Sequence, residues 1–263
     1  MPRDWPDLPI RIVIPVHNRW PDLERCLLSI TQSELVTGLV PSVLVVHDDL
    51  MPDGWEKMFT PSVEYLPAPP SVPWCKSLSL NVGIDAAAQR GPCVIALLDA
   101  DMVVGPKWLM ACHAASNPRF HRVAFVVRGI IPGQPVKWGD QPWFESLRHR
   151  YEAWDQPWFS SSGGRKCNSH RCRCWGNSQG AMRSDVITLA RHDERYMSRG
   201  FEDLDFLVQL MDAITALGEE YRGLVWRQSE FGLLHYEHDP KGWDDPKWTS
   251  HNLCLWNKRR HHT

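Results

Sequence analysis

The stretch VIALLDADMVVGPKW, residues 94–108, decides the fold class of this chain. An apolar run ends directly at Asp99, Ala100 and Asp101, so two carboxylates stand one residue apart. A short apolar run without polar alternation is typical of a strand that is buried on both faces of a parallel sheet. The sequence therefore predicts a buried strand over 92–101 that ends in an acidic pair.

The residues around this strand alternate between strand and helix patterns. Apolar runs predict strands, and segments that begin near Pro or end near Gly predict helices. The expected strands are 10–16, 41–49, 62–69 and 122–131, and the expected helices are 19–33, 74–91 and 106–117. This alternation indicates an α/β fold with a mixed, mainly parallel sheet that is flanked by helices on both faces.

Three of the expected strands end in polar residues. The ends are Val16-His17-Asn18, His47-Asp48-Asp49 and Asp99-Ala100-Asp101. In an open α/β sheet, ligands bind beyond the carboxyl ends of the strands. We call these three strand ends the binding edge, and we expect a ligand to lie against it.

The composition changes after residue 131. The segment 132–176 is rich in Trp, Pro, Gly and Cys, in a chain that holds 14 Trp and 21 Pro. The chain therefore divides into a first half, 1–131, an insertion, 132–176, and a second half, 177–263. The second half is expected to hold a strand and helix over 178–192, a long helix over 200–219 and a strand over 230–240.

The overall charge gives no general argument for an anionic partner. The net charge is −2 over 263 residues, so nucleic acid or an anionic membrane would need a local basic patch. The N-terminal residues lack a signal-peptide pattern, and no apolar stretch is long enough to span a bilayer. We expect a cytoplasmic protein without membrane insertion and with reduced cysteines.

The acidic pair Asp99 and Asp101 has two interpretations. A solvated turn explains an isolated D-x-D motif and is the more common case. At a binding edge, however, two carboxylates supply the hard oxygen ligands of a divalent cation, which in turn would bridge a diphosphate. A diphosphate leaving group needs its charge neutralised as a glycosidic bond breaks, so a cation here would have a catalytic reason.

Seven motifs carry a resemblance to a known family. They are IPVHNRWPDLERCLLSI, VVHDDL, PWCKSLSLNVGIDAA, LLDADM, GAMRSDV, RGFEDLDFLVQL and LLHYEHDP. Their order and spacing resemble the family 2 glycosyltransferases of the GT-A fold, the Rossmann-like fold of nucleotide-diphospho-sugar transferases. The match covers about residues 10–130 and 176–240 and looks closest to the branch of chondroitin-polymerase and galactosyltransferase-like domains. It implies a nucleotide-sugar donor, usually a UDP-sugar, and Mn²⁺ or Mg²⁺.

The resemblance also implies roles for residues of the first half. The nucleotide pocket would be lined by Pro15, His17, Asn18 and Arg19, the ribose and phosphates would lie near Lys76 and Asn81, and the sugar or ribose would face Asp99 and Ala100. Asp48 or Asp49 would face the base or ribose. The family usually reads V-D-D there, and His47 leaves a one-residue ambiguity. Asp101 would ligate the metal ion.

Two motifs of the second half complete the expected site. GFEDLDF is explained in one way as an acidic helix N-terminus, where Glu202 and Asp203 favour the helix dipole. The resemblance implies instead that Asp203 deprotonates an acceptor hydroxyl for an inverting displacement and that Glu202 hydrogen-bonds a sugar. HYEHDP resembles an H-x-x-H turn that completes the metal coordination, with His235 as the first choice and His238 as the second.

The insertion carries a compact group of soft ligands. Cys167, His170, Cys172 and Cys174 could bind a structural Zn²⁺, although their spacing fits no common zinc motif, and free thiols or a redox pair are the alternatives. Nearby lie the basic residues Arg165, Lys166, Arg171 and Arg173, and the aromatic residues Trp138, Trp143, Trp154, Trp158 and Trp175. Such a loop fits an anionic acceptor. A glycan or another soluble polymer is expected, and hydroxymethylated DNA is one candidate.

Two other functions compete with a glycosyltransferase. A nucleotidyltransferase would carry a Gly-rich, basic phosphate loop after the first strand, and PVHNRWPD has none. A zinc-containing nucleic-acid-binding module on a decayed transferase scaffold would have lost the metal and base residues. Asp101, Asp203 and His235 are all present, which favours the enzyme.

Overall fold

The computed structural model describes residues 7–58, 62–125, 127–131, 179–198, 200–226, 229–236 and 246–262. The strands are β1 Ile10–Val16, β2 Ser42–His47, β3 Val63–Pro67, β4 Val94–Leu98, β5 Met102–Val104, β6 Arg122–Phe125, β7 Val127–Ile131, β8 Gln179–Arg183, β9 Gly223–Trp226 and β10 Leu233–Tyr236. The helices are α1 Trp20–Thr37, α2 Trp55–Met58, α3 Lys76–Ala88, α4 Trp108–His113, α6 Ser184–Ile187, α7 Glu202–Ala216 and α8 Pro246–His262. Short 3₁₀ turns lie at Ala114–Ser116 and Ser229–Phe231.

A central seven-stranded sheet has the order β3-β2-β1-β4-β8-β6-β9. The pairs β3-β2, β2-β1, β1-β4 and β6-β9 are parallel, and only β8 runs antiparallel to both of its neighbours. The mixed, mainly parallel sheet predicted from the sequence is therefore confirmed. The strand order reverses direction at β1 and β4, and this is the point where open α/β sheets bind ligands.

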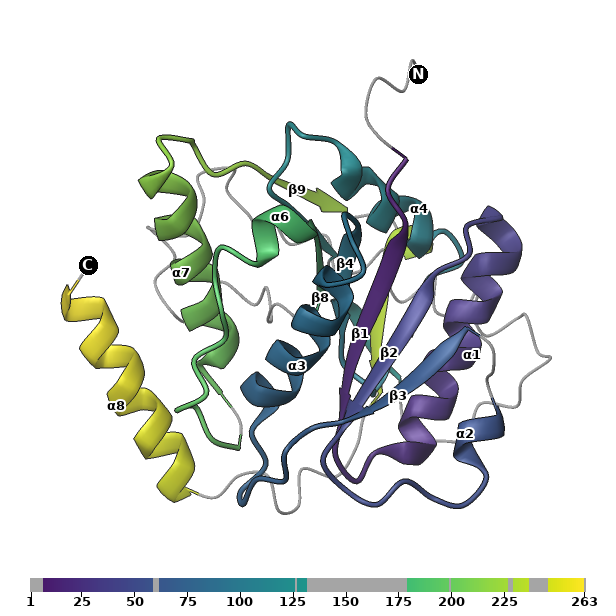
Figure 1. Cartoon of the computed structure of the whole chain (residues 1–263), viewed down its shortest axis with the longest axis horizontal. Coiled ribbons are helices and arrows are strands. Elements are labelled where there is room, and N and C mark those ends of the chain that lie inside the picture. Colours follow the sequence, from purple (N-terminus) through teal and green to yellow (C-terminus); the bar gives the residue numbers. More distant parts are fainter. Residues whose placement is uncertain are drawn as a thin grey trace.

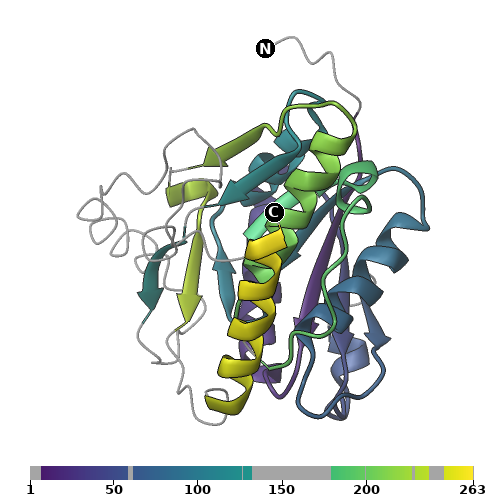
Figure 2. The ribbon, with the colours of Figure 1, turned by 90° about the vertical axis from the view of Figure 1, so that its left-hand side faces the viewer.

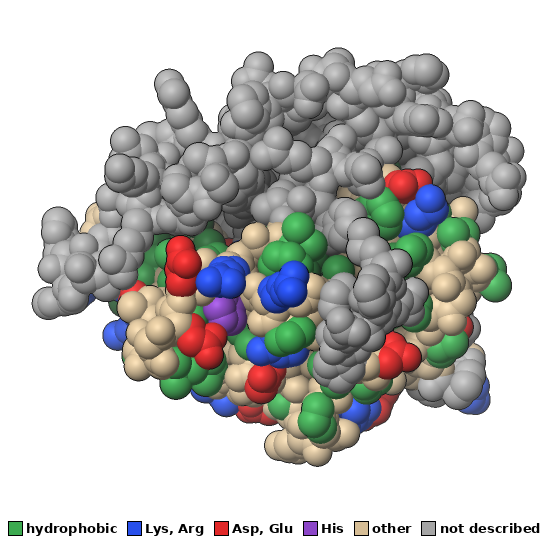
Figure 3. Space-filling view, turned by 90° about the horizontal axis from the view of Figure 1, so that it is seen from above, with side chains coloured by type: hydrophobic (Ala, Val, Ile, Leu, Met, Phe, Trp, Pro, Cys, Tyr) green, Lys and Arg blue, Asp and Glu red, His purple; other side chains and the backbone are tan. Residues whose placement is uncertain are grey.

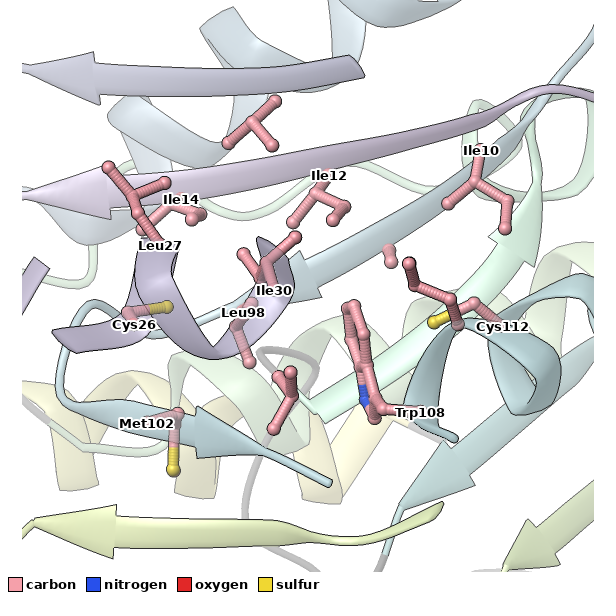
Figure 4. Close-up of a cluster of buried hydrophobic side chains, with 14 of the residues drawn as sticks. Ile10, Ile12, Ile14, Cys26, Leu27, Ile30, Leu98, Met102, Trp108 and Cys112 are labelled. Carbon is pink, nitrogen blue, oxygen red and sulfur yellow. The ribbon is translucent and has the colours of Figure 1, made fainter. Parts of the chain in front are cut away.

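Helices cover both faces of the sheet (Figure 1). Successive residues of β1 point to opposite faces, so Ile12 and Ile14 pack with α1 and α4, whereas Val13 packs with α3, α6 and α7. Figure 4 shows the first of these two cores, to which Leu27 and Ile30 of α1 and Trp108 of α4 belong. Because β1 and β4 are buried on both sides, their sequences are apolar throughout.

The helix α3 packs unusually close to β1. A Cβ atom added to Gly83 would lie 2.3 Å from Cγ1 of Val13, which is far inside van der Waals contact. A larger residue at this position of α3 would force Val13 or the helix to shift. The close packing holds Lys76, the first residue of α3, near the carboxyl end of the sheet.

One expected strand is in fact two. The predicted strand 122–131 divides into β6, which pairs in the central sheet, and β7, which pairs with β10 in a second sheet of order β5-β10-β7. The sequence RVAFVVRGII does not reveal that the chain changes sheets, because the residues of both strands are mainly apolar. The prediction of a single strand was wrong for this reason.

The other expected elements are confirmed within a few residues. The helix expected over 19–33 continues to Thr37, where Gly38 adopts a left-handed φ of 70° and its N–H donates to the carbonyl of Glu34 at 2.8 Å. Four described elements were not predicted at all: α2, β5, β9 and α8. α2, β5 and β9 have four, three and four residues, which is too short for a pattern to be distinct.

The helix α8 lies beside α7 on the outside of the molecule, as both ribbon views show (Figures 1 and 2). At the end of the molecule where β1 begins, the described surface carries acidic and basic side chains without a single predominating sign (Figure 3). Among the described helices, none has the length and apolar character needed to cross a membrane.

Candidate active site

The three polar strand ends lie at one edge of the central sheet. The register aligns Val16 of β1 with His47 of β2, and β4 lies on the other side of β1. The residues that follow these strands therefore meet at the same edge, as the pattern predicts. The insertion 132–176, with the four expected zinc ligands Cys167, His170, Cys172 and Cys174, lies outside the described residues, and so does His238.

His17 lies between a carboxylate and an indole ring. Its Nδ1 is 2.7 Å from Oδ1 of Asp48, and its ring stacks on Trp74 with centroids 5.6 Å apart and planes 13° from parallel. The hydroxyl of Ser71 donates to the other Asp48 oxygen at 3.4 Å. Aromatic faces beside a carboxylate can hold a flat heterocycle by stacking and hydrogen bonding. This end of the edge is suited to a nucleobase.

Asp49 supports the turn after β1. Its Oδ2 accepts hydrogen bonds from the Asn18 backbone N–H at 2.6 Å and from the Trp20 indole at 3.1 Å. Asn18 has a φ of 54°, a left-handed conformation that Asn tolerates better than most residues. The sequence left open whether Asp48 or Asp49 faces the donor. Asp48 contacts the side chains that form the edge, whereas Asp49 fixes the backbone that presents them.

Three other expected nucleotide-pocket residues contribute differently. Pro15 and Ala100 are buried, so they can shape the edge through their backbone and volume. Arg19 donates to the Asp22 carboxylate at 3.2 Å, one turn along α1. Its guanidinium is thus held at the start of α1, next to the edge.

The centre of the site is a lysine surrounded by carboxylates. Nζ of Lys76 lies 2.9 Å from Oδ1 of Asp99 and 3.7 Å from Oδ2 of Asp203. Asp99 follows β4, Asp203 lies in the first turn of α7, and Lys76 begins α3, so three elements meet here. The structure therefore brings together Lys76 and Asp99 of the expected donor site and Asp203, the expected base.

Burial and charge shift the pKa values of this cluster. Burial lowers the pKa of Lys76, but Asp203, Asp99 and Glu202 outweigh it and raise this pKa well above its usual range, so the ammonium stays charged. Burial raises the pKa of Asp99; Lys76 opposes the shift, and Asp101 and Asp203 add to it. The pKa of Glu202 rises to about 7, chiefly through burial and then through the charge of Asp203.

The start of α7 is tied to the start of α3. The Ser198 backbone N–H donates to the Trp74 carbonyl at 2.8 Å, and Ser198 forms an isolated parallel bridge with Cys75. Ser198, Gly200 and Phe201 all have left-handed φ values, of 61°, 103° and 70°. These turns bring the chain from its contact with Trp74 into α7, so that Glu202 and Asp203 lie next to Lys76.

Asn81 is held within the fold. Its amide donates to the His192 carbonyl at 2.9 Å and to Oε1 of Glu194 at 2.8 Å, and its oxygen accepts from the His192 N–H at 3.0 Å. The side chain is 3% exposed, and these hydrogen bonds are all internal. Asn81 fixes the 192–194 segment beneath the site, and its expected contact with the donor stays a prediction.

The expected metal ligands come from adjacent strands. Asp101 directly precedes β5, and the antiparallel pairing of β5 with β10 sets His235 opposite Met102. A carboxylate and an imidazole are donors that Mn²⁺ accepts, so the backbone arrangement fits such an ion. In the described part of the chain, no three His, Cys, Asp or Glu side chains gather in a metal-binding group.

Sequence reasoning missed two contributors to the edge, Ser71 and Trp74, and one residue beneath the site, Glu194. Trp74 stands next to Pro73 in a chain with many Trp-Pro pairs, so nothing distinguished it. The available signal was its position two residues before Lys76, the first residue of α3. Nothing in the sequence distinguished Ser71 from other serines in loops.

Comparisons with known proteins bear on the family and the fold of this chain. The chain matches the family model described as "Glycosyl transferase family 2" over residues 11–185. A search of curated protein sequences found no match.

Similar solved structures share the fold. The structure of S. aureus TarS has a TM-score of 0.60 and 12% identity, covering 94% of this chain and 39% of TarS. The structure of GalNAc-T7 with UDP, GalNAc and Mn²⁺ has a TM-score of 0.56 and 16% identity, covering 92% of this chain and 45% of that one. The structure of S. aureus TarS 1-349 in complex with UDP-GlcNAc has a TM-score of 0.54 and 12% identity, and the match covers 90% of this chain and 61% of that one. The chain thus spans between 39% and 61% of these structures, and their likeness confirms the predicted GT-A fold.

Proposed function

Because the chain belongs to glycosyl transferase family 2, we propose that it moves a sugar from a UDP-sugar to an acceptor hydroxyl with inversion at the anomeric carbon. The observation that carries the proposal is the Lys76 cluster, in which one ammonium lies between Asp99 of the donor-binding edge and Asp203 of α7. Lys76 is suited to face the diphosphate, and Asp203 to face the acceptor.

The reaction is a single displacement. The acceptor oxygen attacks the anomeric carbon as its proton passes to a carboxylate oxygen of Asp203, the bond from that carbon to the diphosphate oxygen breaks, and its electron pair leaves with UDP. Glu202 lies beside Asp203 at the start of α7, and we expect it to hydrogen-bond a sugar hydroxyl, as the family resemblance implies. Lys76 holds the developing negative charge of the diphosphate.

The nucleotide would lie along the binding edge. The His17 and Trp74 rings and the Asp48 carboxylate supply stacking and hydrogen bonding for the base, and Asp99 supplies a hydrogen-bond acceptor for ribose or sugar. Asp101 and His235, with His238, would hold Mn²⁺ or Mg²⁺, and such a cation supplies charge neutralisation for the leaving diphosphate. Membership of the chondroitin-polymerase and galactosyltransferase-like branch stays a prediction.

A panel of nucleotide sugars tests this function. Purified protein is incubated with each UDP-sugar and Mn²⁺, with and without glycan acceptors and hydroxymethylated DNA, and released UDP is measured. Asp203→Asn is expected to abolish transfer while leaving UDP binding intact, and Asp212→Asn, an exposed change on the same helix, is the matched control. Absence of both transfer and UDP binding in the wild type would refute the proposal; loss of UDP binding in Asp203→Asn would refute the assignment of the base.

A further inference from the structure

The segment that leads into α7 requires support from outside itself. Between residues 196 and 201 the described backbone makes three left-handed turns, and two of them are at Ser198 and Phe201, which are not glycines. A non-glycine residue in this conformation is strained, and the strain persists only where the surrounding structure holds it. A contact elsewhere must therefore hold the segment in place.

Asn252 of α8 provides such a contact. Its Nδ2 donates to the Met197 carbonyl at 2.8 Å, and its Oδ1 accepts from the Met197 N–H at 3.1 Å. Both backbone groups of Met197 are thus satisfied by one side chain, as a neighbouring strand would satisfy them. Asn252 is 0% exposed, so the two hydrogen bonds are shielded from water.

Other residues of α8 hold the two ends of the same segment. Nε2 of His251 lies 3.1 Å from the Arg195 carbonyl, and the Trp256 ring stacks on Phe201 with centroids 6.3 Å apart. Arg259 forms an ion pair with Asp205 of α7. In both ribbon views α8 runs alongside α7 (Figures 1 and 2). The contacts of α8 thus converge on the segment that places Asp203.

We propose that Asn252 is a positioning residue for the transfer reaction: through Met197 it holds the segment 196–201 so that α7 begins with Asp203 beside Lys76. This inference rests on the proposed function, in which Asp203 is the base. The effect of Asn252 is therefore greatest on the acceptor half of the site. The segment reaches the edge through the Ser198–Trp74 backbone hydrogen bond, whereas His17, Asp48 and Ser71 are hydrogen-bonded among themselves.

The test compares Asn252→Leu with Asn257→Leu, the same change at an exposed position of α8. For Asn252→Leu we expect kcat to fall about 100-fold, as for a displaced catalytic group, while the Kd for UDP changes less than twofold. Asn257→Leu should resemble the wild type in both. Asn252→Asp keeps only the acceptor for the Met197 N–H, so its kcat should lie between the kcat values of Asn252→Leu and Asn257→Leu. If Asn252→Leu does not fold, Asn252→Asp is compared with Asn257→Leu instead.

A second measurement needs no activity. Hydrogen–deuterium exchange of the amides at 197–205 should be faster in Asn252→Leu, or in Asn252→Asp, than in Asn257→Leu, with exchange in β1 and β4 unchanged. Unchanged exchange at 197–205, an unchanged kcat, or a parallel loss of UDP binding would overturn the positioning role. If the wild type transfers no sugar, the proposed function fails, and the exchange experiment alone then decides whether Asn252 holds this segment.

Discussion

Replacing Lys76 with Met should expose the electrostatic role of this lysine in the fold. Met keeps the apolar length of the side chain and removes its charge. Lys76 is 8% exposed, and its Nζ lies 2.9 Å from Asp99 and 3.7 Å from Asp203. With an effective dielectric constant of about 20, these distances correspond to gross attractions of about 6 and about 4 kcal/mol.

The net loss of stability is smaller than these attractions. Burial of the ammonium has its own cost, and removal of one partner from a buried ion pair typically destabilises a protein by about 3–5 kcal/mol. We therefore expect Lys76→Met to lower the free energy of unfolding by about 3–5 kcal/mol at pH 8. The loss should shrink as pH falls, because Asp99, whose pKa burial already raises, takes up a proton in the variant and then needs no counter-charge.

Urea unfolding at several pH values measures this effect. Lys76→Arg is the charge-preserving control. A second variant, Lys76→Met with Asp99→Asn, should recover part of the lost stability, because one uncompensated carboxylate has been removed. Equal stability of Lys76→Met and wild type at pH 8, or a loss that is the same at pH 5 and pH 8, would refute the assignment of Lys76 as the counter-charge.

Four further outcomes follow from the structure. Glu202 has a folded pKa of about 7, above its usual 4.5, so its protonated form stabilises the fold at low pH and this stabilisation is lost as pH rises through 7. In urea unfolding, the wild type should lose up to about 3 kcal/mol of stability relative to Glu202→Gln between pH 4.5 and 8. Burial, and then the charge of Lys76, lower the pKa of His192 from 6.5 to about 3, so the neutral ring stabilises the fold above pH 6.5. As pH falls from 6.5 to 3, the wild type should lose up to about 4 kcal/mol of stability relative to His192→Phe. Gly83→Ala sets a Cβ 2.3 Å from Val13 and should destabilise by about 1–3 kcal/mol in thermal unfolding, less so when combined with Val13→Ala. Calorimetry should show that Asp101→Asn removes the effect of Mn²⁺ on UDP binding whereas Asp99→Asn keeps it; equal behaviour of the two variants would contradict their separate roles.

The binding edge was predictable because its signal is local. A buried parallel strand is apolar throughout, so a polar residue directly after it marks the carboxyl end of the sheet, and His17, Asp48 and Asp99 were found in this way. The pairing of Lys76 with Asp99 and Asp203 could be expected only through the family resemblance. Neither partner is near Lys76 in the sequence, and the fold alone brings them together.

The supporting contacts were not predictable for a different reason. Asn81 holds residues 111 positions away, and Asn252 holds Met197 55 positions away. The sequence around a single Asn in a helix does not show whether its amide is exposed to water or hydrogen-bonds the backbone of a distant segment. The helix α8 itself was missed because its sequence, PKWTSHNLCLWNKRRHH, is polar on average and carries no regular apolar repeat.

The charge balance of the site links its two halves. One ammonium, on Lys76, meets the aspartates Asp99 and Asp203, and Asp101 adds a third carboxylate beside Asp99. A diphosphate that arrives alone adds negative charge to a site that is already negative, so its binding is opposed unless positive charge arrives with it. UDP affinity should therefore rise with the concentration of a divalent cation. It should also rise in Asp203→Asn without a cation, because that change removes one repelling carboxylate and leaves Lys76 available to the diphosphate.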